Sequence, residues 1–364
     1  MSYRVPGGAD GRLRTAPDPI LDAARRLADH PHDHGWRELY RLLALGLSRR
    51  SPSLTSLLSS ARVLRPGSGA VHLVTLFGIA LRSTANGLFA GMADRTDDET
   101  RLGLLEEAAA SRRADILATM ASRQNSFTGT RRFLTVQVLT AAVFDRRGPA
   151  RFADLGTGLG LLPRQLNSPR LYHRFAPGLS WEGGTPPYRP IPLERRYGVD
   201  KGPMPGLDWV RRCYGASPYY DRLADELESV HTDPELGRVP VRWSEFDLTD
   251  TAALRRFVVR ERINAVNLSY LLYQLTPADK EAILATLRSA LAPPGFILVT
   301  EPRGELGLPG CEVLVRTEAT GAEPLRVYRV SSGHYRGRAA RLEGHRAFEE
   351  LYPIHRAGVP HGPR

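Results

Sequence analysis

The segment Phe152-Ala-Asp-Leu-Gly-Thr-Gly-Leu-Gly160 places three alternating glycines directly after a short apolar run that ends in an acidic residue. This pattern predicts a buried strand that turns into a helix, because glycine permits the turn and lets a ligand approach the backbone closely. A dinucleotide-binding turn requires G-x-G-x-x-G, but Leu161 stands three residues after Gly158. A phosphate-binding loop requires a lysine, and none is near. The spacing therefore excludes these two kinds of nucleotide site.

After residue 145 the chain alternates short apolar runs with amphipathic helical segments, which is typical of a parallel sheet with crossover helices. Seven runs are expected strands: residues 150–155, 197–200, 241–246, 263–269, 296–300, 312–316 and 325–330. One connecting helix is well marked, since Thr276 is suited to cap its N-terminus and Pro277 to occupy its first position. Asp250 is expected at the start of another helix.

The part of the chain before residue 146 has a different periodicity. Apolar residues recur every three to four positions in stretches such as 36–47, 72–83, 101–120 and 131–144, which indicates amphipathic helices. We therefore expect an all-helical N-terminal domain over residues 21–145 and an α/β domain over residues 146–354. The ends, residues 1–20 and 355–364, are rich in Pro, Gly, Arg and His and are expected to be disordered tails.

The formal net charge of +11 raises the question of a nucleic-acid partner. Lys201 and Lys280 are the only lysines, so arginine supplies 48 of the 50 basic residues, spread along the whole chain. This diffuse surplus favours the coding bias of a GC-rich bacterial genome, such as an actinobacterial one, over a binding surface. Cys213 and Cys311 are far apart, no secretory signal is recognisable and no apolar run reaches 18 residues, so we expect a soluble, cytoplasmic protein.

The motif Asp154-Leu-Gly-Thr-Gly-Leu-Gly160 resembles the first motif of the class I S-adenosylmethionine (SAM)-dependent methyltransferases. The resemblance extends over about residues 150–330, because a helix, Pro293-Pro-Gly295 and an apolar strand follow in the order of that superfamily. It implies a Rossmann-like, seven-stranded methyltransferase sheet and SAM as the cofactor. SAM has no phosphate and carries cationic sulfonium and ammonium groups, so a carboxylate beside the loop agrees with it.

Two further segments resemble, more distantly, an uncharacterised bacterial family of methyltransferase-like proteins with a helical N-terminal half. These are Ser122-Arg-Gln-Asn-Ser126, before the last helix of the N-terminal half, and Gly198-Val-Asp-Lys-Gly-Pro203, at the second expected strand. Arg123, Gln124 and Asn125 could then reach the methionine carboxylate of SAM.

The methyltransferase resemblance implies a set of cofactor-binding residues. They are Asp154, Gly156, Gly158, Gly160, Asp200, Asp247, Leu248, Asn267 and Asn125. Asp200 is the candidate for the ribose hydroxyls, because a carboxylate can accept two hydrogen bonds at once. Glu182 is a rival for that role, and the sequence leaves the two open. Asp247 and Leu248 correspond to the contacts with the adenine.

Catalytic candidates follow from the place where methyl group and acceptor should meet, beyond the carboxyl ends of the strands. Tyr270 and His334 are the two that we single out, the histidine because its ordinary pKa suits a general base. Aromatic packing is an equal alternative for Tyr270 and Tyr273, and Glu301 is expected to shape the pocket floor. No His, Asp or Glu cluster has metal-ligand spacing, so no metal is expected.

The sequence favours a transferase that methylates a small organic acceptor at oxygen or nitrogen, in a bacterial specialised metabolism. A SAM-binding protein without methyl transfer, acting as sensor, scaffold or non-methylating catalyst, is the alternative, since no clear catalytic motif follows the fourth strand. A methyltransferase of RNA or protein is a third hypothesis, although the diffuse basic charge argues against a nucleic acid. We expect a small-molecule acceptor, no membrane partner and a homodimer through the helical domain as a possibility.

Overall fold

A computed structural model describes residues 18–29, 34–85, 97–214, 218–302, 310–321 and 323–354. Residues 1–17 and 355–364, which make up nearly all of the expected tails, lie outside this range. The first helix begins at Pro19, and the side chain of its N-cap residue Asp18 accepts a hydrogen bond from the Ile20 amide. Within the described ranges, no helix combines the length and the apolar character needed to span a membrane.

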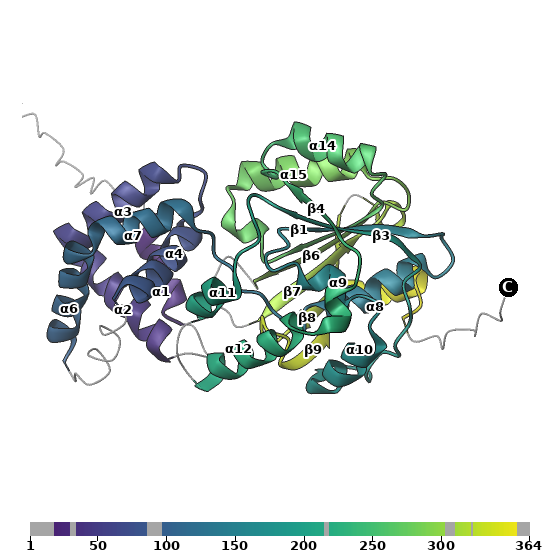
Figure 1. Ribbon diagram of the computed structural model, residues 1–364, viewed down its shortest axis with the longest axis horizontal. Coiled ribbons are helices and arrows are strands. Elements are labelled where there is room, and N and C mark those ends of the chain that lie inside the picture. The colour runs from purple at the N-terminus through teal and green to yellow at the C-terminus, as the bar shows by residue number, and fades with distance from the viewer. Residues whose placement is uncertain are drawn as a thin grey trace, which may run out of the picture.

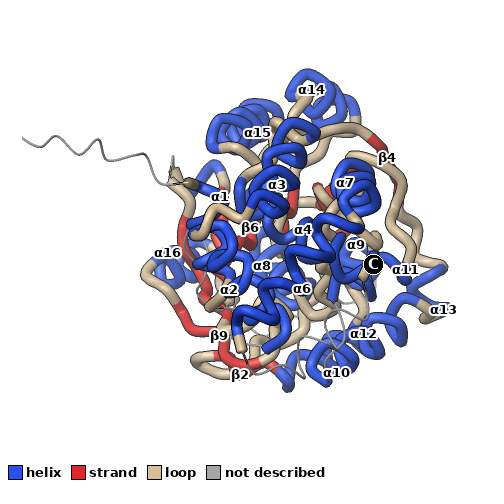
Figure 2. Tube along the Cα trace, turned by 90° about the vertical axis from the view of Figure 1, so that its left-hand side faces the viewer, coloured by secondary structure: helices blue, strands red, loops and turns tan. Residues whose placement is uncertain are grey.

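The N-terminal half is helical as expected, and it forms one lobe of the molecule, purple to blue in Figure 1 and nearest the viewer in Figure 2. Its helices are α1 (Pro19–Leu27), α2 (His34–Ser48), α3 (Pro52–Leu64), α4 (Ala70–Thr84), α6 (Asp98–Ser111) and α7 (Arg113–Ser122). The central helix is α4, which contacts α1, α3 and α7 and buries its residues from Val71 to Arg82. A helix that is apolar on all sides needs neighbours all round, and the other helices supply them.

The next helix, α8 (Phe133–Phe144), leaves this lobe and packs on the sheet. All twelve of its residues are buried, and it contacts α9 (Leu161–Gln165) and strand β6 (Phe296–Pro302). The rings of Phe144 and Phe296 meet edge to face, with centroids 6.3 Å apart. Sequence periodicity thus identified the helix but could not tell which part of the molecule it covers.

The rest of the described chain forms a mixed α/β fold with a mostly parallel sheet. Its strands are β1 (Ala150–Leu155), β2 (Leu179–Trp181), β3 (Leu193–Asp200), β4 (Arg242–Glu245), β5 (Ala265–Ser269), β6, β7 (Cys311–Arg316), β8 (Leu325–Val330) and β9 (Gly337–Arg341). Among the described residues the sheet has nine strands, in the order β2-β9-β8-β7-β6-β5-β1-β3-β4. The expected count of seven was therefore wrong.

All seven expected runs are strands, and the two that were missed lie together at one edge of the sheet. β2 has three residues, too few to show an alternation, and β9 reads Gly-Arg-Ala-Ala-Arg, without a β-branched or aromatic residue. Trp181 of β2 packs edge to face on Tyr328 of β8, at 5.4 Å between centroids. Tertiary packing and strand pairing, rather than local pattern, make these two segments strands.

Strands β4, β3, β1, β5 and β6 run parallel to their neighbours, whereas β7, β8 and β9 form antiparallel pairs next to β6. β3 and β4 lie on one side of β1, and the later strands β5 and β6 lie on its other side. At such a reversal the connections diverge and leave a crevice beyond the carboxyl ends of the strands.

Helices cover both faces of the sheet (Figure 1). On one face, α14 (Thr251–Arg260) and α15 (Pro277–Ala290) bury apolar residues against β1, β3 and β5. The remaining helical segments are α10 (Pro169–Phe175), α11 (Leu207–Tyr214), α12 (Pro218–His231), α13 (Pro234–Gly237), α16 (Gly344–Leu351) and the 3-10 turns η1 (Ala176–Gly178), η2 (Leu272–Gln274) and η3 (Glu318–Thr320). Two expected helix starts are confirmed: Thr276 caps α15 and Asp250 caps α14.

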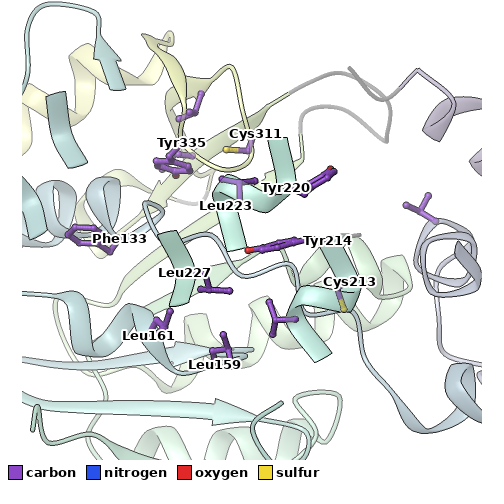
Figure 3. Packing of buried hydrophobic residues seen from close by; sticks show 14 of the residues in the cluster. Phe133, Leu159, Leu161, Cys213, Tyr214, Tyr220, Leu223, Leu227, Cys311 and Tyr335 are labelled. Carbon is purple, nitrogen blue, oxygen red and sulfur yellow. The ribbon is translucent and has the colours of Figure 1, made fainter. Parts of the chain in front are cut away.

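The two parts of the molecule meet through a few specific contacts. Gly69 at the start of α4 donates a hydrogen bond to the carbonyl of Gln274 in η2 (3.1 Å), and Trp36 of α2 donates to the carbonyl of Tyr214 in α11 (2.9 Å). Tyr214 in turn stacks on Tyr220 of α12, with centroids 5.8 Å apart, within the core that Figure 3 shows. One hydrophobic cluster contains residues of both parts, and the domain boundary at residue 145 stays a prediction.

Replacing Phe296 by alanine should lower the free energy of unfolding by about 3–5 kcal/mol, because it empties a fully buried position between β6 and α8. Urea unfolding followed by circular dichroism measures the change. Val259→Ala, on a side chain that is 55% exposed, is the control and should change the free energy by less than about 0.5 kcal/mol. Equal effects of the two substitutions would contradict this assignment of the core.

Candidate functional site

A cavity of about 860 Å³ lies at the carboxyl ends of the parallel strands, at the point where the strand order reverses. Its sheet side consists of residues that follow β1, β3, β4 and β5. Its other wall comes from the helical lobe, namely from the turn between α3 and α4 and from the segment after α7. The volume lies near the upper end of the range of about 300–1,000 Å³ for small-molecule sites.

The glycine turn forms one edge of the cavity. Gly156 and Gly158 line it with φ angles of +76° and +55°, in the left-handed region that favours glycine. The amides of Gly156 and Thr157 both donate to the carbonyl of Val199, which fastens the turn to β3. The turn therefore has a fixed shape and exposes backbone, rather than side chains, to the cavity.

Asp154, the last residue but one of β1, is buried beneath this turn. Its two carboxylate oxygens accept hydrogen bonds from the amide of Asn267 on β5 (2.7 Å) and the hydroxyl of Thr157 (2.8 Å). Burial raises the pKa of Asp154 to about 6, although these hydrogen bonds act in the opposite direction. The carboxylate is thus ionised at neutral pH and adds negative charge where the cavity meets the turn.

Asp200 lines the cavity at the end of β3. Its carboxylate oxygens accept hydrogen bonds from the backbone amides of Gly158 and Lys201, both at 2.8 Å, and burial raises its pKa. A carboxylate has about four acceptor positions, so two remain for a ligand. Glu182, its rival, lies outside the cavity lining and pairs with Arg338 at the far edge of the sheet (2.9 Å).

Asp247 and Leu248 line the cavity after β4. Asp247 pairs with the ammonium of Lys201 (2.6 Å) and accepts hydrogen bonds from Thr249. Burial acts to raise the pKa of Asp247, but the ammonium and the hydrogen bonds outweigh it and hold the pKa below its usual value. Leu248 is 7% exposed, so it offers a small apolar surface beside that carboxylate.

Arg132 is a buried cation that faces the cavity. It is 7% exposed, its Nε donates to the carbonyl of Gly333 (2.9 Å), and its guanidinium lies 3.8 Å from the centre of the Tyr270 ring. Within the described ranges no carboxylate pairs with it, whereas its neighbour Arg131 is paired with Glu226. A buried charge is stable only when it is compensated, so Arg132 is positioned to bind an anion.

The helical lobe supplies a polar wall. Arg65 donates to the side-chain oxygen of Gln124 (3.0 Å) and to carbonyls at the C-terminus of α7, including that of Ala121 (3.2 Å). The indole of Trp209 donates to the carbonyl of Gln124 (2.8 Å). These contacts hold the expected SAM-contacting segment in place across the cavity. Arg123 stands over the ring of Trp209, 5.2 Å from its centre.

Asn125 lines the cavity, but its side chain already forms hydrogen bonds with other residues of the protein. Its amide nitrogen donates to the hydroxyl of Tyr273 (3.0 Å) and its oxygen accepts from the Phe127 amide (3.2 Å). The structure thus gives Asn125 a role in joining the helical wall to η2, and Arg132 is better suited to a ligand carboxylate.

Tyr270 follows β5 with φ of +54°, an unfavourable region for a tyrosine. Its ring lines the cavity, but its hydroxyl lies next to Gly333 and bonds Cys311, and burial raises its pKa well above the usual value. Such a hydroxyl stays protonated, which does not suit a general base. Glu301, expected at the pocket floor, instead accepts three backbone hydrogen bonds from residues 271–273.

Three predicted site residues do not line the cavity. Gly160 lies beneath Trp243 and Met204, whose side chains would touch any added Cβ. Asn267 is fully buried below Asp154 and orients it rather than a ligand. His334 packs edge to face on Tyr214 and Tyr220, at 5.7 and 6.1 Å between centroids. Each residue follows or belongs to an expected element, but it does not reach the cavity lining.

Sequence reasoning missed Arg132, His72 and Ser269, which all line the cavity. Arg132 stands directly before a mostly apolar helix, a position that could have drawn attention to it. His72 interrupts an apolar helix of the other lobe, and nothing local indicates that it meets the sheet.

Comparisons with known proteins assign no family to the chain. No protein-family model matches it, and no curated protein matches it significantly. We therefore derive a function from the residues of the cavity.

The raised pKa of Asp154 predicts how the free energy of unfolding changes with pH. A carboxyl with a pKa of about 6 in the folded protein and about 3.8 in the unfolded chain contributes stability below pH 3.8 that is lost as the pH rises through 6. Relative to wild type, Asp154→Asn should therefore gain about 2 kcal/mol of unfolding free energy between pH 4 and pH 7. Urea unfolding of both proteins at several pH values measures this difference, and a difference independent of pH would contradict it.

Proposed function

We propose that the protein is a SAM-dependent methyltransferase that acts on a small organic acceptor at oxygen or nitrogen. The observation that carries the proposal is the charge pattern of the cavity. The carboxyl groups of Asp154 and Asp200 lie at the glycine turn, and the guanidinium of Arg132, which has no carboxylate partner among the described residues, lies in the same cavity. SAM carries both signs of charge, as a zwitterionic amino acid joined through a sulfonium to a neutral nucleoside.

The residues present fit each part of SAM. The free acceptor positions of Asp200 suit the two ribose hydroxyls, and Asp247 with Leu248 offers a hydrogen-bond acceptor and an apolar surface for the adenine. Arg132 suits the carboxylate of the amino-acid part. The buried charge of Asp154 favours a cation near Gly156 and Gly158, where glycine lets the ligand approach the backbone.

The topology supports the same proposal. The parallel strands β4-β3-β1-β5-β6 have the order of one type of doubly wound nucleotide-binding sheet, in which ligands bind at the reversal point. A Rossmann-like methyltransferase sheet is therefore part of the proposal, with β7, β8 and β9 as an antiparallel extension and β2 pairing parallel to β9 at the far edge.

When bound, SAM supplies an electrophilic methyl group, and the protein has to hold an acceptor in line with it and exclude water. The helical wall closes the cavity opposite the strand ends and provides that second surface. The cavity volume leaves room for an acceptor beside a nucleoside. This room favours methyl transfer over a SAM-binding protein without turnover, which would need a single site.

Calorimetry tests the cofactor. Wild type should bind SAM and S-adenosylhomocysteine, and Asp200→Asn should weaken both by about tenfold or more, because a charged acceptor of two hydrogen bonds is lost. Glu182→Gln is the matched control on the rejected ribose candidate and should bind as wild type does. Failure of wild type to bind either compound would overturn the proposal, and a loss in Glu182→Gln alone would reverse the assignment. Gly158→Arg should abolish binding by filling the cavity at the turn.

The role of Arg132 is tested by the choice of ligand. Arg132→Met should weaken S-adenosylhomocysteine binding by about tenfold or more, since the carboxylate of that compound loses its ion partner. Adenosine lacks the amino-acid part, so its affinity should be the same for variant and wild type. Equal losses for the two ligands would show that Arg132 acts through the fold of the site instead.

A further inference from the structure

Two buried polar atoms in the cavity lack a hydrogen-bond partner among the described residues. They are Nδ1 of His72 and Oγ of Ser269. Buried polar atoms nearly always have a partner, and an unpaired one in a cavity indicates a ligand that supplies it. One of these atoms comes from the helical lobe and the other from the sheet, so the missing ligand has to lie between the two walls.

Both residues belong to the β5 end of the cavity. Ser269 is the last residue of β5, and η2 follows three residues later. The start of α4 is fixed against η2 by the bond from Gly69 to Gln274 and by the bridge between Ser68 and Leu275, and His72 lies one helical turn further on. The ribose and adenine candidates follow β3 and β4, on the other side of β1. The β5 end is therefore the part of the cavity left for a second molecule.

The surroundings of His72 restrict that molecule's chemistry. Phe127, Tyr273 and Leu275 line this end with apolar and aromatic surface. His72 is 2% exposed, and burial, followed by the charge of Arg65, lowers its pKa to about 3, so the imidazole is neutral at physiological pH. A neutral imidazole can accept a hydrogen bond at one nitrogen.

Positive charge also surrounds this end. The guanidinium of Arg65 bonds only to carbonyl and amide oxygens among the described residues, and Arg132 has no carboxylate partner there. Asp279 reaches the lining too, but it sits in the first turn of α15 and accepts from Thr276. A protonated amine would be repelled by the guanidinium of Arg65, whereas a neutral hydroxyl would not be.

We propose that the β5 end of the cavity is the acceptor site, and that its acceptor is a small aromatic or enolic hydroxyl compound whose hydroxyl donates to Nδ1 of His72. This inference rests on the proposed function and narrows it to acceptors that bind through oxygen. Ser269 provides a second polar contact on the opposite wall. His72 acts as the residue that positions the hydroxyl.

The test uses 4-methylphenol as probe and 4-methylanisole, its methyl ether, as a ligand that cannot donate. Both are titrated into the full chain saturated with S-adenosylhomocysteine. Wild type should bind the phenol about tenfold or more tightly than the ether, because only the phenol satisfies the buried nitrogen. In His72→Leu, which keeps an apolar side chain in an apolar helix, the preference should disappear through weaker binding of the phenol.

His231→Leu is the matched control, because His231 also has a buried Nδ1 without a hydrogen-bond partner among the described residues but lies outside the cavity lining. It should keep the full preference for the phenol. No binding of the phenol, equal affinity for phenol and ether in wild type, or an unchanged preference in His72→Leu would each overturn the inference. Calorimetry with S-adenosylhomocysteine on the same proteins keeps this result separate from the proposed function, whose failure would appear as a loss of that binding in wild type.

Discussion

The site depends on keeping one carboxylate, that of Asp154, out of water at the edge of the sheet. Its oxygens need donors, and the Asn267 amide and the Thr157 hydroxyl supply them from β5 and from the glycine turn. The Gly158 amide of that turn donates a hydrogen bond to Asp200 on β3. The next residue, Lys201, forms an ion pair with Asp247 after β4. Hydrogen bonds and one ion pair thus connect the ends of four strands. Removing Asn267 or Thr157 leaves the buried carboxylate of Asp154 without one of its donors, so these bonds also fix the shape of the site.

Two arginines add the opposite charge. Arg65 of the helical lobe and Arg132, directly before α8, have no carboxylate partner in the described chain and line the cavity that the aspartates also line. This separation of charge inside one cavity is costly for an empty protein, because each buried charge loses hydration. It becomes favourable when a ligand brings the complementary charges in the right order. The charges of the site are therefore complementary to those of the zwitterionic ligand that we propose.

The sequence predicted most of what depends on local pattern. The seven strand runs and the helix caps at Asp250 and Thr276 follow from periodicity and backbone chemistry. Residues at the ends of parallel strands could be grouped in advance, because those ends share one edge of the sheet, and Asp154, Asp200 and Asp247 do line one cavity. What could not be predicted depends on contacts between distant segments: the pairing of β2 with β9, and the side chains that the other lobe presents. His334 failed as a candidate because a sequence position after a strand does not fix the direction of a side chain.

The cavity has two walls that belong to different stretches of the chain, and they touch at few points, such as the bond from Gly69 to Gln274. Substitutions in α4 or in the turn before it alter one wall and leave the strand ends unchanged. The two walls can therefore change independently during evolution. A lineage that keeps the sheet edge and varies the helical lobe would retain the proposed cofactor site and change the acceptor that it binds. Relatives of this protein should then differ most in the residues around His72.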